Sequence, residues 1–398
     1  MTGIDREFIE QVAADLVRIN SVNPTLAPGG PGEREVAAYT ADLMDRLGLE
    51  VGEHEPVPGR VSVTGRLRGT GGGRSLMLNA HYDTVGIDGM PDPFSGVIRE
   101  GKLYGRGAYD MKSSLAACLA AVRALRAEGE RLAGDVVVAA VADEEDASIG
   151  TRDLVEHVRV DGAIVTEPTA LDLCVAHKGF VWIELTVRGR AAHGSKPELG
   201  MDANVRMARV LARMGTLIDE LAARSPHPLV GPPSMHVARL EGGTGLSTYA
   251  AECVAALERR TVPGETDEQV LRELEAVLDA ARREDPSLRI TLEHLLTRDP
   301  FETSPDGPLA RAVLTALGAV RGRPAAVVGD TPWMDAAILA AHGVETVVCG
   351  PAGTGAHAAE EWVDLDSVER LAAVLVRAAR EYCGGITPPG ALARRAVS

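Results

Sequence analysis

Acidic and histidine side chains follow several apolar, strand-like runs of this sequence. The first pair is His81 and Asp83, which stand two residues apart at the end of the run LMLNA. In an extended backbone such residues project to the same side, so the Asp83 carboxylate could orient a metal-bound imidazole of His81. An isolated HxD triplet is more often structural or solvated, and further evidence must come from other positions.

Residues of the same kinds recur at later strand ends. In an open parallel sheet, the loops at the carboxyl ends of the strands converge on one crevice, so distant positions can meet there. Two imidazoles and three carboxylates are enough for two zinc ions that share a bridging carboxylate. The candidate ligands are His81, Asp110, Glu145, Glu167 and His357.

Glu144 and Glu145 form a carboxylate pair whose members can take different roles. Because neighbouring side chains diverge, one can bind metal while the other faces a bound water. A carboxylate beside such a water is a natural general base. A lone pair of glutamates is usually a solvated turn, and it is the coincidence with the other strand-end residues that favours chemistry.

Composition excludes several classes of partner. The net charge of −16 over 398 residues argues against nucleic acid and anionic membranes. No run reaches the roughly 18 apolar residues that a membrane span needs, and the N-terminus lacks the pattern of a signal peptide. The five cysteines are scattered and odd in number, which suits a reducing compartment. We therefore expect a cytoplasmic protein.

Helical and strand-like runs alternate through both ends of the chain. This alternation predicts an α/β domain whose mostly parallel sheet has helices on both faces. The expected strands are 50–54, 60–67, 75–80, 135–142, 162–165, 325–328 and 345–349, and the expected helices are 5–19, 33–47, 111–128, 149–157, 335–341 and 365–382.

The order changes in the middle of the chain to strand, helix, strand, strand, helix, strand. That order predicts a ferredoxin-like α+β domain with two helices on one face of an antiparallel sheet. The expected boundaries are 178–297 for this inserted domain, with 1–177 and 298–398 forming the catalytic, metal-binding domain.

Seven segments resemble the two-zinc aminoacylases and peptidases, a family that includes acetylornithine deacetylase, succinyl-diaminopimelate desuccinylase, aminoacylase and carboxypeptidase G. They span essentially the whole chain in the family's order, and the GRG..DMK and DEE segments are highly specific. The segments are NAHYDTV, PFSGVIREGKLYGRGAYDMKS, DEE, TEPT, AAHGSKPELGMDA, ERRTVPGET and GPAGTGAHAAEEWV.

The resemblance implies roles for the strand-end residues. Asp110 would bridge two zinc ions, with cobalt or manganese as alternatives, and the other four candidate ligands would complete the coordination. Asp83 would orient His81. Glu144 would deprotonate the metal-bridging water and carry the proton to the leaving nitrogen. In this reading the inserted domain would serve as a lid and would form a homodimer.

The resemblance also assigns residues of the inserted domain. His193 would stabilise the oxyanion, either in its own subunit or across a dimer. Arg260 would pair with a substrate carboxylate, although Arg259 is adjacent and the choice between them stays open. Gly242 and Gly243 would form a loop near the same pocket.

Glu167 favours one branch of the family. Deacylases and carboxypeptidases tend to carry glutamate at this place, whereas dipeptidases and tripeptide aminopeptidases tend to carry aspartate. We therefore expect hydrolysis of the amide of an N-acyl amino acid, and acetylornithine deacetylase is the nearest single comparison. The alternatives are a dipeptidase or glutamate-type carboxypeptidase acting on a short peptide, and a catalytically silent amino-acid-binding protein.

Two departures from the common pattern concern the substrate contacts. Asp202 stands where relatives often carry asparagine, and TPWMDAA replaces the usual glycine-threonine-aspartate run while Asp335 keeps the acid.

Overall fold

The computed structural model describes residues 3–127 and 132–384, which fold as two compact units. The first unit contains Met1–Val175, Thr303–Val328 and Met334–Ser398 within those limits. The second unit contains Ala176–Glu302 together with Gly329–Trp333, which comes from much later in the chain. The last residue of the expected helix 111–128 lies outside the described residues.

The largest sheet in the described part of the chain has nine strands. Its order is β1-β2-β6-β3-β7-β15-β8-β13, with β14 paired to β8. The central strands β6, β3, β7 and β15 are parallel, and antiparallel pairs flank them. The strands are β1 (Glu50–Val57), β2 (Arg60–Leu67), β3 (Leu76–His81), β6 (Val136–Val141), β7 (Gly162–Val165), β8 (Leu173–His177), β13 (Phe301–Glu302), β14 (Val327–Asp330) and β15 (Glu345–Val348).

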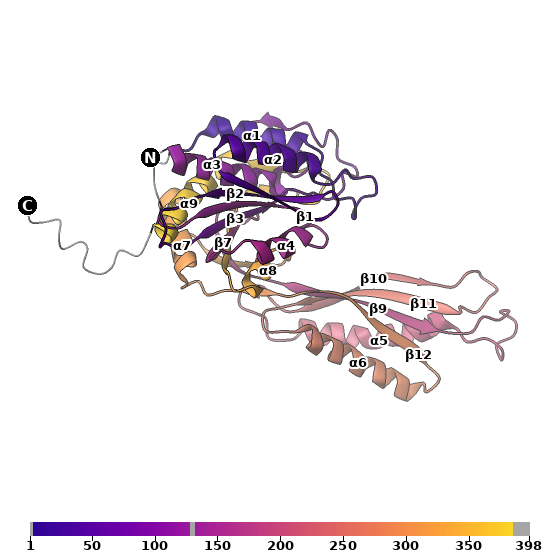
Figure 1. Cartoon of the computed structure of the whole chain (residues 1–398). Helices are drawn as coiled ribbons and strands as arrows, with labels where there is room; N and C mark the ends of the chain where they lie inside the picture. Colours follow the sequence, from indigo (N-terminus) through magenta and orange to yellow (C-terminus); the bar gives the residue numbers. More distant parts are fainter. Residues whose placement is uncertain (1–2, 128–131, 385–398) are drawn as a thin grey trace, which may run out of the picture. The chain divides into compact units, whose positions relative to one another are not determined.

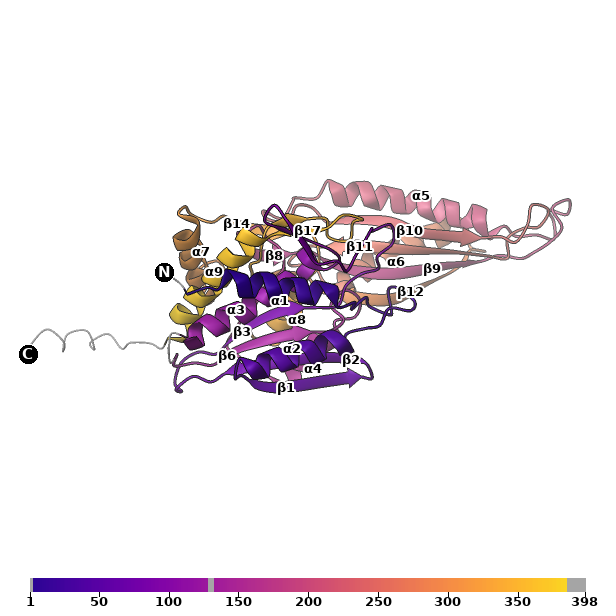
Figure 2. The same ribbon diagram turned by 90° about the horizontal axis from the view of Figure 1, so that it is seen from above.

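Every residue of β3, β6 and β7 is buried, because helices cover both faces of the sheet. In Figure 1, α1 (Arg6–Arg18), α2 (Arg34–Arg46) and α3 (Ser113–Ala127) lie on one face, and α4 (Ile149–His157) and α8 (Ala336–Ala341) lie on the other. Figure 2 shows α1, α3 and α9 (Leu365–Cys383) side by side, and α7 (Pro308–Arg321) packs against α9. The predicted α/β class is confirmed.

A small antiparallel sheet connects two loops that matter below. Its order is β16-β17-β5-β4, so the strand after His357 pairs with the strand before Asp110. The strands are β4 (Val97–Arg99), β5 (Lys102–Tyr104), β16 (Gly353–Thr354) and β17 (Trp362–Asp364).

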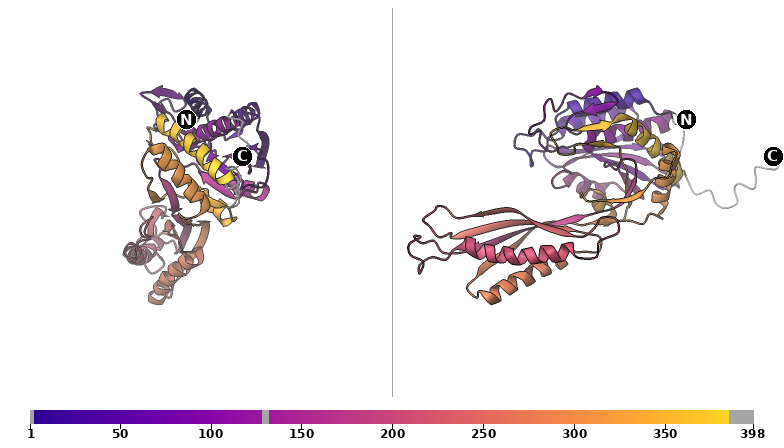
Figure 3. Two further views of the ribbon diagram at one scale, coloured as in Figure 1. Left: turned by 90° about the vertical axis from the view of Figure 1, so that its left-hand side faces the viewer. Right: turned by 180° about the vertical axis from the view of Figure 1, so that it is seen from behind.

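The second unit has the predicted order strand, helix, strand, strand, helix, strand. Its antiparallel sheet runs β10-β11-β9-β12, and both helices lie on one face (Figures 1 and 3). This is a ferredoxin-like arrangement. The elements are β9 (Gly179–Arg188), α5 (Ala203–Ala222), β10 (Ser234–Gly242), β11 (Glu252–Thr261), α6 (Asp267–Glu284) and β12 (Arg289–Arg298).

The second unit is stabilised by packing between the apolar faces of its sheet and its helices. Alternate residues of β9 are buried, and α6 buries residues spaced by three or four, such as Leu274 and Leu278. Thr266 and Gln269 form a capping box that fixes where α6 begins. All five cysteines are buried and free, so they act as packing residues. None of the described helices is both long and apolar enough to cross a membrane.

Candidate metal centre

The candidate ligands of the first unit come from neighbouring strand ends. His81 is the last residue of β3, the DEE segment follows β6, and Glu167 follows β7. Because β6, β3 and β7 are adjacent and parallel, their carboxyl ends open onto one edge of the sheet. Asp110 lies in the π-helical turn Ala108–Lys112, and His357 lies in the loop between β16 and β17.

The side chains form two groups that share Asp110. In one group, His81 Nε2 lies 3.0 Å from Asp110 Oδ1 and 3.4 Å from Glu167 Oε1. In the other, His357 Nε2 lies 2.9 Å from Glu145 Oε2 and 3.5 Å from Asp110 Oδ2. Each oxygen of Asp110 thus faces a different imidazole, which is the arrangement of a carboxylate that can bridge two metal ions.

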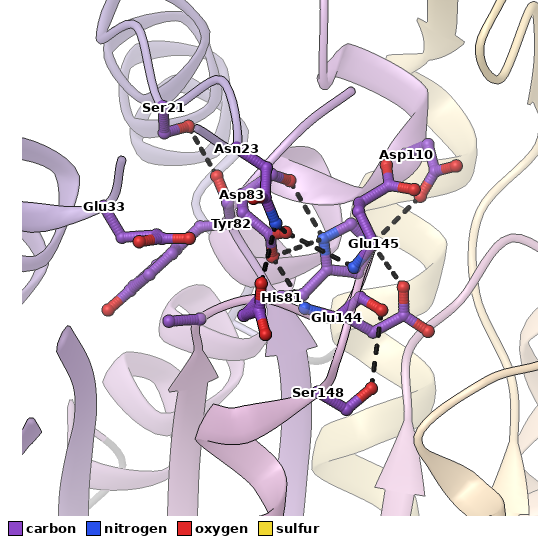
Figure 4. Close-up of polar contacts among 12 residues, drawn as sticks. Ser21, Asn23, Glu33, His81, Tyr82, Asp83, Asp110, Glu144, Glu145 and Ser148 are labelled. Atoms are coloured by element: carbon purple, nitrogen blue, oxygen red, sulfur yellow. Dashed lines mark hydrogen bonds and ion pairs between the residues drawn. The ribbon is translucent and has the colours of Figure 1, made fainter. Parts of the chain in front are cut away.

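Glu144 points to different partners from Glu145. Its Oε2 lies 4.0 Å from His81 Nε2, and donor atoms of His81, Glu144 and Glu167 all fall within 4.8 Å of one another. Glu145 belongs to a group of the same size with His81 and Asp110. Figure 4 shows both glutamates beside His81, with Glu145 next to Asp110. The two carboxylates can therefore do different chemistry at one site.

His81 is held in a single tautomer. Its Nδ1 lies 3.0 Å from the main-chain oxygen of Asp83, and because a carbonyl can only accept, Nδ1 carries the proton. When the ring is neutral, Nε2 presents its lone pair toward Asp110 and Glu167, as a metal ligand requires. The carboxylate of Asp83 stands 3.6 Å from Nδ1, so the nearer orienting contact comes from the residue's carbonyl.

The Asp83 carboxylate positions the DEE loop. It accepts hydrogen bonds from the main-chain N–H of Glu144 at 3.0 Å and of Glu145 at 3.3 Å. Asn23 Nδ2 donates to the same carboxylate at 2.9 Å and to Asp143 at 2.9 Å (Figure 4 shows Asn23 above Asp83). The position of both glutamates thus depends on a buried aspartate behind them.

Arg60 connects this hydrogen-bond network to Glu33. Its guanidinium donates two hydrogen bonds to Glu33, at 2.8 and 2.7 Å, and one to Asp143 at 2.6 Å, and all three residues are buried. Bidentate arginine–carboxylate pairs fix geometry strongly. Asn23, Arg60 and Glu33 were not predicted from the sequence, since nothing in their spacing relates them to the strand ends.

Glu361 organises the turn that carries Asp110. Its buried carboxylate accepts from the main-chain N–H of Gly107, Tyr109 and Asp110 at 3.1, 2.9 and 3.1 Å, and from Arg106 at 2.7 Å. Glu361 lies within the segment GPAGTGAHAAEEWV, but the pattern alone gave it no role.

Burial and mutual repulsion raise the pKa of three carboxyls, those of Glu144, Glu145 and Glu167. Hydrogen bonds to Asp110 and Glu145 raise the pKa of His357 to about 10. Burial alone would lower the pKa of His81, but neighbouring carboxylates raise it well above its ordinary value. The cluster therefore lacks positive charge, and imidazole nitrogens with carboxylate oxygens are suitable ligands for divalent metals.

The candidate histidine of the second unit lies in an exposed loop. His193 Nδ1 is 2.8 Å from Ser195 Oγ, and the residue pairs by a backbone bridge with Thr248. Gly242 ends β10, and Gly243 follows it with a φ of 84°, which favours glycine.

The neighbouring residues Arg259 and Arg260 differ in how far they are exposed to solvent. Arg259 is 1% exposed and pairs with Glu265 at 2.6 Å. Arg260 is partly exposed, donates to Glu258 at 2.7 Å and lies over the ring of Phe180. Arg259 is thus bound within the interior of the unit, whereas Arg260 is partly open to solvent.

A family comparison agrees with the site. The model of peptidase family M20/M25/M40 matches residues 77–381. The chain belongs to this family. It is an amide-bond hydrolase, as the motifs predicted, and the family uses divalent metals and acts on small amino-acid or peptide substrates.

Individual relatives carry related names. The chain is 31% identical to an acetylornithine deacetylase of Myxococcus xanthus over 88% of its own length and 90% of the relative's. It is 28% identical to an acetylornithine deacetylase of Proteus mirabilis, over 94% and 97%. The structure of aminopeptidase PepT from Bacillus cereus superimposes with a TM-score of 0.78 at 19% identity, covering 95% of this chain and 99% of that one.

Proposed function

We propose that this M20/M25/M40 hydrolase is a deacylase that cleaves the amide between an acyl group and the nitrogen of an amino acid. The observation that carries the proposal is the pair of imidazole–carboxylate groups that share Asp110. The names of the two curated relatives favour a substrate of the acetylornithine type.

The residues present fit a two-metal site. His81 and Glu167 would hold one ion, His357 and Glu145 the other, and Asp110 would contact both. Zinc suits this mixture of nitrogen and oxygen ligands, with cobalt or manganese as alternatives. When bound, such ions lower the pKa of water and polarise a carbonyl.

Glu144 would act as the general base that transfers a proton from the attacking water to the leaving nitrogen. Its carboxylate lies beside His81 and Glu167, whereas Glu145 pairs with His357. Asp83 and Asn23 would keep Glu144 in place through the main chain.

The second unit would supply substrate contacts. Arg260 would bind the α-carboxylate of the amino acid, because Arg259 is committed to Glu265. His193 would stabilise the oxyanion, and the Gly242–Gly243 loop would lie near the substrate. We further propose a homodimer formed through this unit, in the cytoplasm.

A substrate panel tests the reaction. N-acetyl, N-succinyl and N-aroyl amino acids and dipeptides would be incubated with the enzyme, with zinc and with a chelator, and products identified by mass spectrometry. Chelator-sensitive release from acyl amino acids is expected. Cleavage of dipeptides alone would replace the deacylase with a peptidase, and binding without turnover would indicate a silent binding protein.

Mixing variants tests the dimer and His193 together. His193→Ala and Glu144→Gln should each be nearly inactive as purified proteins. If His193 acts across the dimer, mixed dimers should regain part of the activity, whereas action within one subunit predicts no recovery. A monomer in sedimentation experiments would contradict the dimer.

A further inference from the structure

A second group of metal-binding side chains lies on the first unit, where α4 packs against β1. His54 comes from β1, and Asp153 and His157 stand one turn apart on α4. One ring nitrogen of each histidine and one carboxylate oxygen lie within 4.8 Å of one another. We propose that His54, Asp153 and His157 bind one divalent transition-metal ion, in addition to the central site.

The spacing of the three groups leaves room for an ion. His54 Nδ1 lies 3.8 Å from Asp153 Oδ2, and one ring nitrogen of His157 lies within 4.8 Å of both of those groups. The separation between His54 and Asp153 exceeds a hydrogen bond. In a tetrahedral zinc site with ligand distances near 2.0–2.1 Å, ligand atoms stand about 3.3 Å apart. Small side-chain rotations would therefore close the three ligands around an ion.

Hydrogen bonds already orient both imidazoles. His157 Nδ1 lies 2.8 Å from the main-chain oxygen of Asp153, to which it must donate, so the other ring nitrogen keeps its lone pair. His54 Nε2 lies 3.5 Å from Thr64 Oγ1, and its Nδ1 faces Asp153. Metal-bound histidines commonly donate their second nitrogen to a carbonyl or hydroxyl in this way.

The surroundings suit a cation that water can reach. The side chains of His54, Asp153 and His157 are 16%, 23% and 57% exposed, so solvent can complete the coordination. The group also lies at the C-terminal end of α4, where the helix dipole favours positive charge. Two nitrogens and one oxygen favour zinc, cobalt, nickel or copper over magnesium or calcium.

Such an ion would cross-link α4 to the edge strand β1. α4 begins directly after the DEE loop, and Asp143 accepts hydrogen bonds from the main-chain N–H of Ala147 and Ile149 at 3.2 and 3.4 Å. The site therefore lies at the far end of the helix that follows the Glu144–Glu145 segment. Its role would be to clamp this helix, separately from the chemistry.

Metal counting tests the site without using activity. Full-length protein would be stripped with a chelator and titrated with Zn²⁺ and with Co²⁺, and bound metal would be measured by mass spectrometry. Wild type should bind one equivalent more than His157→Ala at micromolar free metal. His54→Gln and Asp153→Asn should lose the same equivalent, and His342→Ala should not, although His342 also contacts α4 through Glu156 at 3.5 Å.

The central site can be removed as a second control. In Asp110→Ala, one equivalent that depends on His157 should remain, so failure of the central proposal would not affect this one. Circular dichroism would establish that each variant is folded. Equal metal content in folded wild type and folded His157→Ala, or an extra equivalent seen only at millimolar metal, would overturn the proposal.

Discussion

The two units bury different kinds of side chain. The core of the second unit is mainly apolar, built from β9, β11, α5 and α6, and the buried charges of that unit are cations, Lys178, Arg259 and Arg298, of which Arg259 pairs with Glu265. The first unit also has an apolar core, but it buries a chain of charges at the carboxyl edge of its sheet. These include Glu33, Arg60, His81, Asp83, Arg106, Asp143, Glu167, Asp335 and Glu361.

Burying a charge is unfavourable unless it is paired, and even a paired one is weak evidence for stability. In the first unit the charges form a connected set, from Arg60 through Asp143 and Asn23 to Asp83 and the DEE loop. Part of the interior of the first unit therefore positions the candidate ligands, whereas the second unit is stabilised mainly by apolar burial. Variants should separate the two roles.

Glu144→Gln should have the largest effect on turnover. Removing a general base commonly slows a reaction by about 10²–10⁴-fold, because no other group takes the proton. The amide keeps the size of the side chain, so the metal content should not change. Steady-state kinetics and metal analysis of the same sample measure both. Glu156→Gln, on the exposed side of α4, is the matched control, and a kcat within threefold of wild type would exclude Glu144 as the base.

Arg60→Met should act at a distance from the ligands. It leaves Glu33 and Asp143 buried without their cation, which typically lowers stability by about 3–5 kcal/mol. Loss of a supporting contact behind metal ligands typically weakens metal binding by about 10–100-fold. Competition with a chromophoric chelator measures the affinity.

Arg66→Met provides the control for Arg60, since it lies on the same strand. Arg66 pairs with Asp135 at 2.7 Å but is partly exposed, so its loss should cost about 0–1 kcal/mol. If both variants bind metal equally well, Arg60 has no positioning role and the charge network is only structural.

The sequence predicted the parts of the site that depend on local pattern. HxD after an apolar run and DEE after another can be found because each lies directly after its strand. Arg60 and Glu361 could not be found, because their partners lie 83 and 251 residues away and only the tertiary fold brings them together. The helix α7 was also not predicted, although Pro308 at its start and Gly322 just after its end are ordinary helix-boundary signals.

The pH dependence of metal uptake should distinguish the central site from an ordinary surface site. In the metal-free protein, Asp110 and Glu145 raise the pKa of His357 to about 10, so this imidazole is protonated at neutral pH. A metal needs the neutral nitrogen and must displace the proton, so affinity should rise with pH up to that pKa. The change is about tenfold per pH unit for each proton released. Calorimetry in buffers of different ionisation enthalpy counts the protons, and affinity that is constant with pH would contradict this assignment.

Leu278→Ala should have the smallest effect on turnover. Leu278 lies in α6 and is fully buried in the apolar core of the second unit, so its truncation should lower stability by about 2–5 kcal/mol. Leu154→Ala makes the same change at a fully buried position of α4, the helix that follows the DEE loop in the chain. At a temperature where both variants are folded, Leu278→Ala should keep kcat and metal content within about twofold of wild type, while Leu154→Ala should lower at least one of them. Denaturant unfolding gives the stability of each. Equal loss of kcat in both folded variants would mean that packing in the second unit also positions the catalytic groups, and the division between the units would have to be abandoned.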